Sequence, residues 1–221
     1  MSPQKVGQGD GSIVPSDLVA DQRKRSKRRV GIAENRSNYM INTLLYCCEK
    51  KIPASIYCDP SDRQKHYTGY IEKVNKNEIL IAHISNNGYY DGYVLRPTED
   101  IYRIDYDGEY EKRIDTLYKA RRQTHNVLFI ISDKESLFLS ALRAAKENDL
   151  VVSLILDDDC RTGWIKGYDN DVVLLRALND NGEKDGIAIV RVSDVDVLEI
   201  DTDYEQDLRL LSEHRGRLKT D

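Results

Sequence analysis

The segment Thr68-Gly69-Tyr70-Ile71 recurs 94 residues later as Thr162-Gly163-Trp164-Ile165. The same spacing relates Asp91-Gly92 to Asp185-Gly186, so that a stretch of about forty residues aligns without a gap. Upstream of this stretch the spacing becomes 98, because one polar loop is four residues longer in the first copy. Internal repeats define the unit that folds. The chain is therefore a duplicated module.

Each copy shows the pattern of a helix, five short strands and a closing helix. Apolar residues at helical spacing predict helices, and short alternating apolar runs between turn residues predict strands. The predicted strands of the first copy are Ile52–Cys58, Tyr67–Val74, Glu78–Ser85, Asp91–Arg96 and Ile101–Tyr106. Those of the second copy are Leu150–Leu156, Gly163–Tyr168, Val172–Leu178, Gly186–Val190 and Val195–Ile200. Helices are expected over Asn38–Lys50, from Gly108 to about Arg122, from a capping box at Ser132-x-x-Glu135, and over Asp203–Arg215.

This pattern resembles the Sm/LSm-like superfamily, and more narrowly the uncharacterised bacterial proteins with Sm-like domains. The first copy carries the resemblance in Gly69-x-Ile71, Ile79-Leu80-Ile81 and Val94-Leu95-Arg96. The second carries it in Gly163-x-Ile165, Val172-Val173-Leu174-Leu175 and Ile189-Val190-Arg191. The resemblance implies a mainly β protein with flanking helices, built as two tandem Sm-like (SH3-like) five-stranded small barrels. Each barrel would have an N-terminal and a C-terminal helix.

The repeat and the composition together predict five segments. They are a disordered basic N-terminal arm (1–36), the first Sm-like barrel (37–122), an apolar linker (123–131), the second Sm-like barrel (132–215) and a tail (216–221). The apolar run Val127–Ile131 has no counterpart before the first barrel, and we expect it to be buried.

The resemblance implies RNA as the ligand class, although the loops that bind RNA in the family are altered here. The first loop is shortened to Asn75-Lys76-Asn77, and the second reads Arg96-Pro97-Thr98 without a glycine after the arginine. Short Asn-rich loops also suit any tight turn. Asn75, Lys76, Asn77 and Arg96 are therefore candidate nucleic-acid contacts, with a purely structural turn as the alternative.

The clearest positive signal for nucleic acid is a basic cluster in the N-terminal arm. Six of seven consecutive residues are positively charged: Arg23, Lys24, Arg25, Lys27, Arg28 and Arg29. Contacts from such residues to phosphates supply affinity that does not depend on sequence. Basic runs also act as solvating tails or as contacts to acidic proteins. Residues 132–221 have a net charge of −9, so they are a possible acidic partner within the chain.

Tyrosines are concentrated in the first copy, which holds twelve of the fourteen. Tyr89 and Tyr90 lie at a predicted loop tip, where packing does not readily explain them. Aromatic side chains can stack on bases, and tyrosine is also enriched at protein interfaces. We therefore assign this pair as candidate interaction residues and leave both partners open.

No catalytic or metal-binding motif is present in the sequence. The four cysteines show no CxxC spacing, and HExxH, GxSxG and phosphate-binding glycine loops are missing. We expect no catalytic residues, no metal and no cofactor. We also expect a cytoplasmic protein without membrane association, because no run approaches the roughly 18 apolar residues of a span.

These observations predict a non-catalytic binding or scaffold protein. RNA is its leading ligand class, through the basic arm and the barrel loops. The alternative is a protein–protein interaction module that does not bind nucleic acid. Homo-oligomerisation by pairing of edge strands is a further expectation, because Sm-like rings form in this way.

Overall fold

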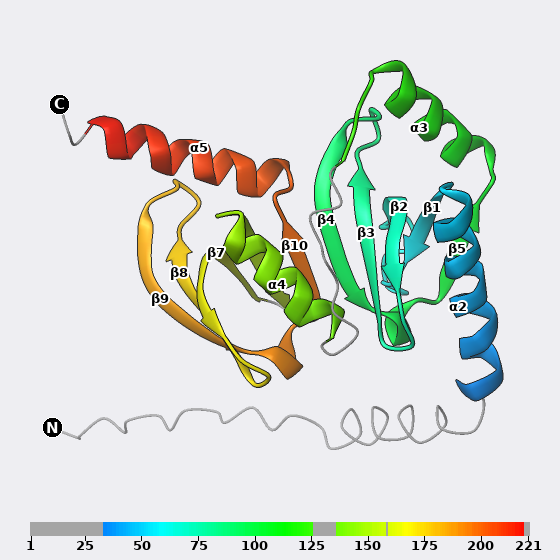
Figure 1. Cartoon of the computed structure of the whole chain (residues 1–221), viewed down its shortest axis with the longest axis horizontal. Helices are drawn as coiled ribbons and strands as arrows, with labels where there is room; N and C mark the ends of the chain where they lie inside the picture. The colour runs from blue at the N-terminus through cyan, green and yellow to red at the C-terminus, as the bar shows by residue number, and fades with distance from the viewer. Residues whose placement is uncertain (1–32, 126–135, 158, 219–221) are drawn as a thin grey trace, which may run out of the picture. The chain divides into compact units, whose positions relative to one another are not determined.

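The computed structural model describes residues 33–125, 136–157 and 159–218 (Figure 1). Within it, Tyr39–Asp221 form one compact unit. Most of the predicted arm, the predicted apolar segment Val127–Ile131 and the last residues of the predicted tail lie outside the described residues. The first described helix begins at Ala33, earlier than expected, so the last residues assigned to the arm are helical.

The order of elements is the same in both repeats. The first repeat contains α2 (Ala33–Lys50), β1 (Pro53–Tyr57), β2 (Tyr67–Val74), β3 (Glu78–Ile84), β4 (Tyr90–Pro97), a 3₁₀ turn η1 (Thr98–Asp100), β5 (Arg103–Tyr106) and α3 (Glu109–Ala120). The second contains α4 (Leu137–Glu147), β6 (Val151–Leu156), β7 (Asp159–Tyr168), β8 (Val172–Leu178), β9 (Lys184–Arg191), η2 (Val192–Asp194), β10 (Val197–Ile200) and α5 (Asp203–Leu218).

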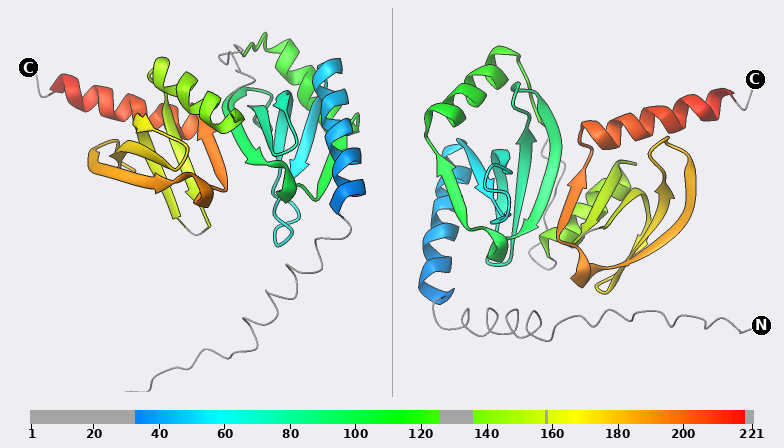
Figure 2. Two further views of the ribbon diagram at one scale, coloured as in Figure 1. Left: turned by 60° about the horizontal axis from the view of Figure 1, so that its bottom comes forward. Right: turned by 180° about the vertical axis from the view of Figure 1, so that it is seen from behind.

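The ten described strands form one open antiparallel sheet in the order β5-β1-β2-β3-β4-β10-β6-β7-β8-β9. Each repeat contributes the same internal order, with its fifth strand beside its first. The protein is thus mainly β, with helices flanking the sheet. β4 and β9 are long and strongly curved (Figures 1 and 2).

A glycine in the second strand of each repeat permits this packing. A β-carbon on Gly69 would lie 2.0 Å from the carbonyl oxygen of Ala82, and one on Gly163 would lie 2.2 Å from that of Arg176. Only glycine allows the neighbouring backbone to come so close. Shortly after each glycine the register shifts, which bends the sheet. The repeated glycines therefore have a structural role, which is to let neighbouring strands approach closely where the sheet bends.

Each repeat also buries a carboxylate that holds its closing helix against the first two strands. Glu205 of α5 is fully buried and accepts hydrogen bonds from the hydroxyl of Ser153 and, at 2.9 Å, from the backbone N–H of Thr202. Glu111 of α3 accepts one from Ser55 at 2.5 Å. Buried carboxylates are tolerated where such partners satisfy them. This pair of clusters explains why a closing helix follows each set of strands.

The helix α4 begins differently from the prediction. Ser136 caps it, and its hydroxyl accepts the backbone N–H of Leu139 at 3.2 Å. The carboxylate of Glu78 in β3 also accepts the N–H of Leu137 at 2.8 Å. The predicted capping box at Ser132-x-x-Glu135 lies outside the described residues. A side chain of the first repeat thus helps to hold the first helix of the second.

Candidate interaction surface

The predicted nucleic-acid residues divide into two groups. Arg23, Lys24, Arg25, Lys27, Arg28 and Arg29 lie outside the described residues. Asn75, Lys76, Asn77 and Arg96 lie at one end of β3, where Ile79 is paired with Arg96. The structure therefore brings the two predicted loops together.

The Asn75–Asn77 loop is a tight turn held by its own side chain. The amide oxygen of Asn75 accepts the backbone N–H groups of Asn77 and Glu78, both at 2.8 Å. The turn is joined to η1, because the hydroxyl of Thr98 donates to the carbonyl of Lys76 at 2.6 Å. The side-chain oxygen that could contact a ligand is therefore engaged in the turn, as the structural alternative for this loop requires.

Arg96 is half-buried and packs on an aromatic ring. Its guanidinium carbon lies 5.5 Å from the centre of the Tyr67 ring, a cation–π distance. The second repeat holds a similar cation–π pair at other positions, in which the guanidinium carbon of Arg176 lies 4.9 Å from the centre of the Trp164 ring. Arg96 is therefore part of the packing of the first repeat as well as a neighbour of the loop.

Tyr89 and Tyr90 lie at the opposite end of β3, where Ile84 is paired with Tyr90. The exposed ring of Tyr89 lies under Arg121, whose Nη1 donates to the tyrosine hydroxyl at 2.8 Å. Tyr90 is partly buried, and its ring stacks on His125. The two predicted groups of residues are therefore separated by the length of a strand and do not form one site.

The two repeats meet where β4 pairs with β10. Tyr93 lies opposite Ile200 and Leu95 opposite Leu198. All four of these side chains are buried, with Tyr93 0% and Leu95 3% exposed. Their burial supplies the apolar part of the contact between the repeats.

Polar bonds surround this apolar contact. The hydroxyl of Tyr67 donates to Glu199 of β10 at 3.1 Å. Asp91 accepts the backbone N–H of Asp203 at 2.8 Å, at the start of α5, and lies 3.1 Å from Nδ1 of His83. The first repeat therefore binds both the last strand and the last helix of the second.

Burial and hydrogen bonding shift the pKa values of these carboxyl groups in opposite directions. Burial, aided by the nearby Glu205, raises the pKa of Glu199. Burial also acts to raise the pKa of Asp91, but the bonds from His83 and Asp203 outweigh it and leave the pKa lowered. The surroundings of Asp91 thus stabilise its charged form, whereas those of Glu199 disfavour its charged form.

Among the described strands, β5 and β9 lie at the two ends of the sheet and have one neighbour each. On β9, Ile187 is 60% exposed and Ile189 is 68% exposed. A strand edge presents unpaired N–H and C=O groups and readily pairs with another chain. The exposed isoleucines beside such an edge form the candidate interaction surface, which the sequence pattern of β9 did not single out.

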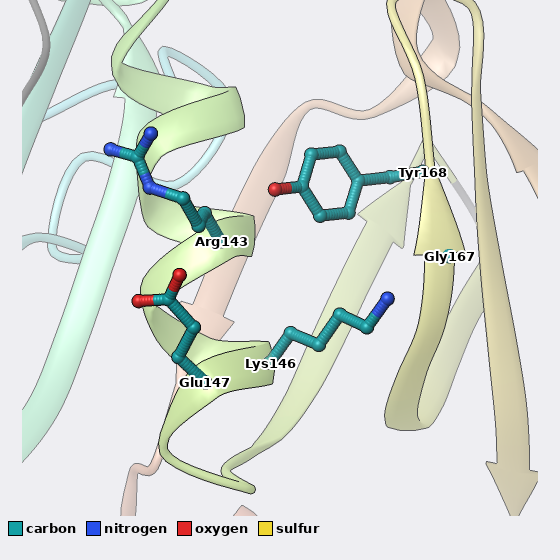
Figure 3. Close-up of a pocket in the computed structure, with 5 residues that line it drawn as sticks. All are labelled: Arg143, Lys146, Glu147, Gly167 and Tyr168. Carbon is teal, nitrogen blue, oxygen red and sulfur yellow. The ribbon is translucent and has the colours of Figure 1, made fainter.

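A separate hollow of about 590 Å³ lies between α4 and β7 and is open to solvent. Arg143, Lys146 and Glu147 line it from the helix and Gly167 and Tyr168 from the strand (Figure 3). Figure 3 shows the Tyr168 ring directed from β7 toward α4, and Lys146 extending toward β7. None of the predicted site residues lines this hollow.

Within residues 33–125, 136–157 and 159–218, no group of three or more His, Cys, Asp or Glu side chains is placed to hold a metal ion. No helix in those ranges is long and apolar enough to cross a membrane.

Comparison with protein-family models, curated proteins and solved structures gave no match to this chain.

Proposed function

We propose that this protein is a non-catalytic interaction module that binds other protein chains through the edges of its β-sheet. The observation that carries the proposal is the edge strand β9, which pairs only with β8 among the described strands and exposes Ile187 and Ile189. Proteins commonly protect their edge strands with proline, charge or a covering element. β9 contains no proline, and these two apolar side chains remain in solvent. Such a surface is typical of an interface.

The proposed mode of binding is the addition of a strand. An incoming strand would pair with the free backbone groups of β9, and its alternate side chains would cover Ile187 and Ile189. The architecture supports this mode, because β4 already binds a strand of the other repeat in this way. We propose further that each repeat is an Sm-like small barrel. The repeated order β5-β1-β2-β3-β4 supports this assignment.

The test is capture of partners from an extract of the source cells on the immobilised full chain. Three forms are compared: wild type, Ile187→Asp/Ile189→Asp, and Leu210→Asp. Leu210 is 63% exposed on α5, so its variant changes a comparable apolar side chain outside the strand edge. We expect partners that wild type and Leu210→Asp retain and that the double variant loses. Retention of the same set by all three forms would refute the proposal.

RNA is a second candidate ligand, favoured by the six positive charges in Arg23–Arg29. The mechanism would be electrostatic capture of phosphates by the arm, with further contacts from the loop at Asn75–Asn77 and Arg96. The cation–π packing of Arg96 and the engaged side chain of Asn75 favour the arm as the main contributor. A salt-dependent binding experiment, described in the Discussion, tests this candidate.

A further inference from the structure

We propose that the hollow between α4 and β7 binds a small organic anion that carries a phosphate or a carboxylate group. Lys146, with Arg143 one turn before it on the helix, would bind the anionic oxygens, and the open place at Gly167 would admit the rest of the molecule. The volume of about 590 Å³ is that of pockets that bind small molecules. The site is independent of the proposed function, because none of the residues that line it belongs to β9.

The first repeat provides an internal reference, because the same place is closed there. At the spacing of 98 residues, Lys146 of α4 corresponds to Cys48 of α2. The thiol of Cys48 donates to the backbone carbonyl of Glu72 at 3.6 Å, which places α2 directly against β2. Val74, the counterpart of Tyr168 at the spacing of 94, packs against the same apolar cluster as Cys48. The hollow is therefore not a requirement of the duplicated fold.

The positions that line the hollow differ from the first repeat in one direction. Three apolar side chains of the first repeat are replaced by hydrogen-bond donors, free cysteine being counted as a small hydrophobe. The replacements are Arg143 for Leu45, Lys146 for Cys48 and Tyr168 for Val74. They add two positive charges to a part of the chain, residues 132–221, whose net charge is −9. An acidic surface repels anions in general, so an anion site in it requires local positive charge of this kind.

Gly167 keeps the hollow open although the fold does not require a glycine there. Its counterpart Lys73 occupies the same place in the register, directly after the shift that follows Ile71 in β2 and Ile165 in β7. Gly167 does not have a positive φ, and nothing lies within 4 Å of a β-carbon built on it. A glycine inside a strand costs conformational entropy and often marks a place where a ligand comes close to the backbone. The open place at Gly167 therefore favours a bound molecule.

The donors reach the hollow from both of its walls. Lys146 lies in the last turn of α4 and extends toward β7, and the Tyr168 ring is directed from β7 toward α4 (Figure 3). None of the ion pairs among the described residues involves Lys146. A lysine ammonium carries three donors and binds phosphate or carboxylate oxygens as a point charge. Lys146 is therefore the residue on which binding of the anion should depend most.

Glu147 follows Lys146 on the helix and makes the sign of the ligand testable. It is exposed and lines the same hollow. Its counterpart in the first repeat is Glu49, so this acidic position does not differ between the repeats. A carboxylate beside a bound anion repels it, whereas it would attract a bound cation. Removal of the charges of Lys146 and Glu147 should therefore change the affinity for an anion in opposite directions.

The test is a titration of the purified full chain with inorganic phosphate, glucose 6-phosphate and citrate, followed by the NMR shifts of its backbone amides. Neutral glucose is the control ligand. We expect one of the two organic anions to shift the amide signals of Lys146 and Gly167 in a saturable way, and glucose to leave them unchanged. Binding of glucose 6-phosphate identifies a phosphate ligand, and binding of citrate identifies a carboxylate ligand. Signals at the hollow also distinguish this site from binding to the basic segment Arg23–Arg29, which every variant retains.

Four variants test the assignment. Lys146→Gln should weaken binding by roughly 10-fold, the value of one hydrogen bond to a charged group. Glu147→Gln should tighten binding by roughly 3-fold, as expected for loss of an exposed like charge. Gly167→Gln should abolish binding, because it fills the hollow with a neutral side chain close in length to that of Lys73. Lys184→Gln removes a positive charge from β9, outside the hollow, and should leave the affinity unchanged.

The outcomes are distinct. Absence of saturable shifts at the hollow with all of the anions overturns the proposal. Equal weakening by Lys146→Gln and Lys184→Gln, or weaker binding by Glu147→Gln, overturns it as well, because neither result fits an anion held at this place. Thermal unfolding checks that each variant is folded, and the exposed positions Lys146 and Glu147 decide if Gly167→Gln is not. A Lys146→Gln variant that is less stable but binds as wild type does would leave Lys146 only a structural role at the end of α4 and would also contradict the proposal.

Discussion

Leu95 of β4 lies opposite Leu198 of β10, and this pairing joins the two repeats into one sheet. Both side chains are buried, and a layer of polar bonds from Tyr67, His83 and Asp91 surrounds them. The contact between the repeats therefore resembles the interior of a domain more than a flexible linkage.

Gly92→Ala should destabilise the protein more than Gly186→Ala. Both positions have positive φ, so both substitutions impose backbone strain of roughly 1 kcal/mol or more. Only the new methyl group at position 92 would also overlap the backbone of Ile200 and Thr202. We expect an additional loss of about 2 kcal/mol for Gly92→Ala. Urea denaturation of the two variants checks this difference, and equal losses would contradict the proposed role of Gly92.

Glu199→Gln should stabilise the protein at neutral pH. Burial raises the pKa of Glu199, so the folded state holds the proton more tightly than the unfolded state does. Ionisation therefore costs stability as the pH rises through the folded pKa. The amide removes this cost and can still accept the hydroxyl of Tyr67, so we expect a gain of roughly 1 kcal/mol.

The gain from Glu199→Gln should disappear as the pH falls below the unfolded pKa of about 4.3, where wild-type Glu199 is also neutral. Thermal unfolding between pH 4 and pH 8 measures this dependence. Glu183→Gln is the control, because Glu183 is exposed and pairs only with Arg215 among the described ion pairs. A gain that is the same at every pH would show that ionisation is not its cause.

Glu205→Ala should cost about 2 to 4 kcal/mol of stability. The substitution leaves the buried hydroxyl of Ser153 and the buried N–H and hydroxyl of Thr202 without their acceptor. Glu213→Ala on the same helix is the matched control. Among the described residues Glu213 pairs with Arg209 alone, and this pair is exposed, so its loss should cost less than about 0.5 kcal/mol. Chemical denaturation compares the two variants, and similar losses would argue against the buried cluster as the anchor of α5.

We expect RNA binding to depend on the basic arm. Replacing Arg23, Lys24, Arg25, Lys27, Arg28 and Arg29 by Gln in the full chain should strongly weaken binding at low salt. The slope of log K against log salt should become shallower by about 4, the contribution of six phosphate contacts on a single strand. Lys76→Gln is the matched variant in the loop and should have a smaller effect. An electrophoretic shift assay over a salt series measures both, and absence of any shift by wild type at low salt removes RNA as a candidate.

Local sequence patterns predicted most of the elements. The predicted strands Tyr67–Val74 and Val172–Leu178 coincide with β2 and β8. Alternating apolar residues and turn residues are local signals, so they identify a strand without knowledge of its partners. The start of α4 was less predictable, because the N-cap Ser136 is supported by Glu78, a residue far away in the sequence.

The candidate site was predicted only in part. The expectation of edge-strand pairing named the type of contact, but the sequence did not distinguish β9 from β4. Both strands carry large aliphatic or aromatic residues at the matching positions, with Ile187 and Ile189 in place of Tyr93 and Leu95. The available sequence signal for this contact was the repeated pair Asp91-Gly92 and Asp185-Gly186, but Asp-Gly is also an ordinary turn pattern. The sequence likewise indicated a loop at Asn75–Asn77 but not that Asn75 is engaged within it.

The duplicated pattern alone was enough to establish the repeated unit, because glycine spacing and apolar alternation are properties of neighbouring residues. Which strands face each other is a long-range property that alternation does not contain. Pairing of β4 with β10 buries Tyr93 and Leu95 and occupies the bare backbone at Gly92. Their counterparts Ile187 and Ile189 on β9 have β8 on one side and no strand on the other among the described residues, so they remain exposed. Only the tertiary structure therefore distinguished a core strand from an exposed edge.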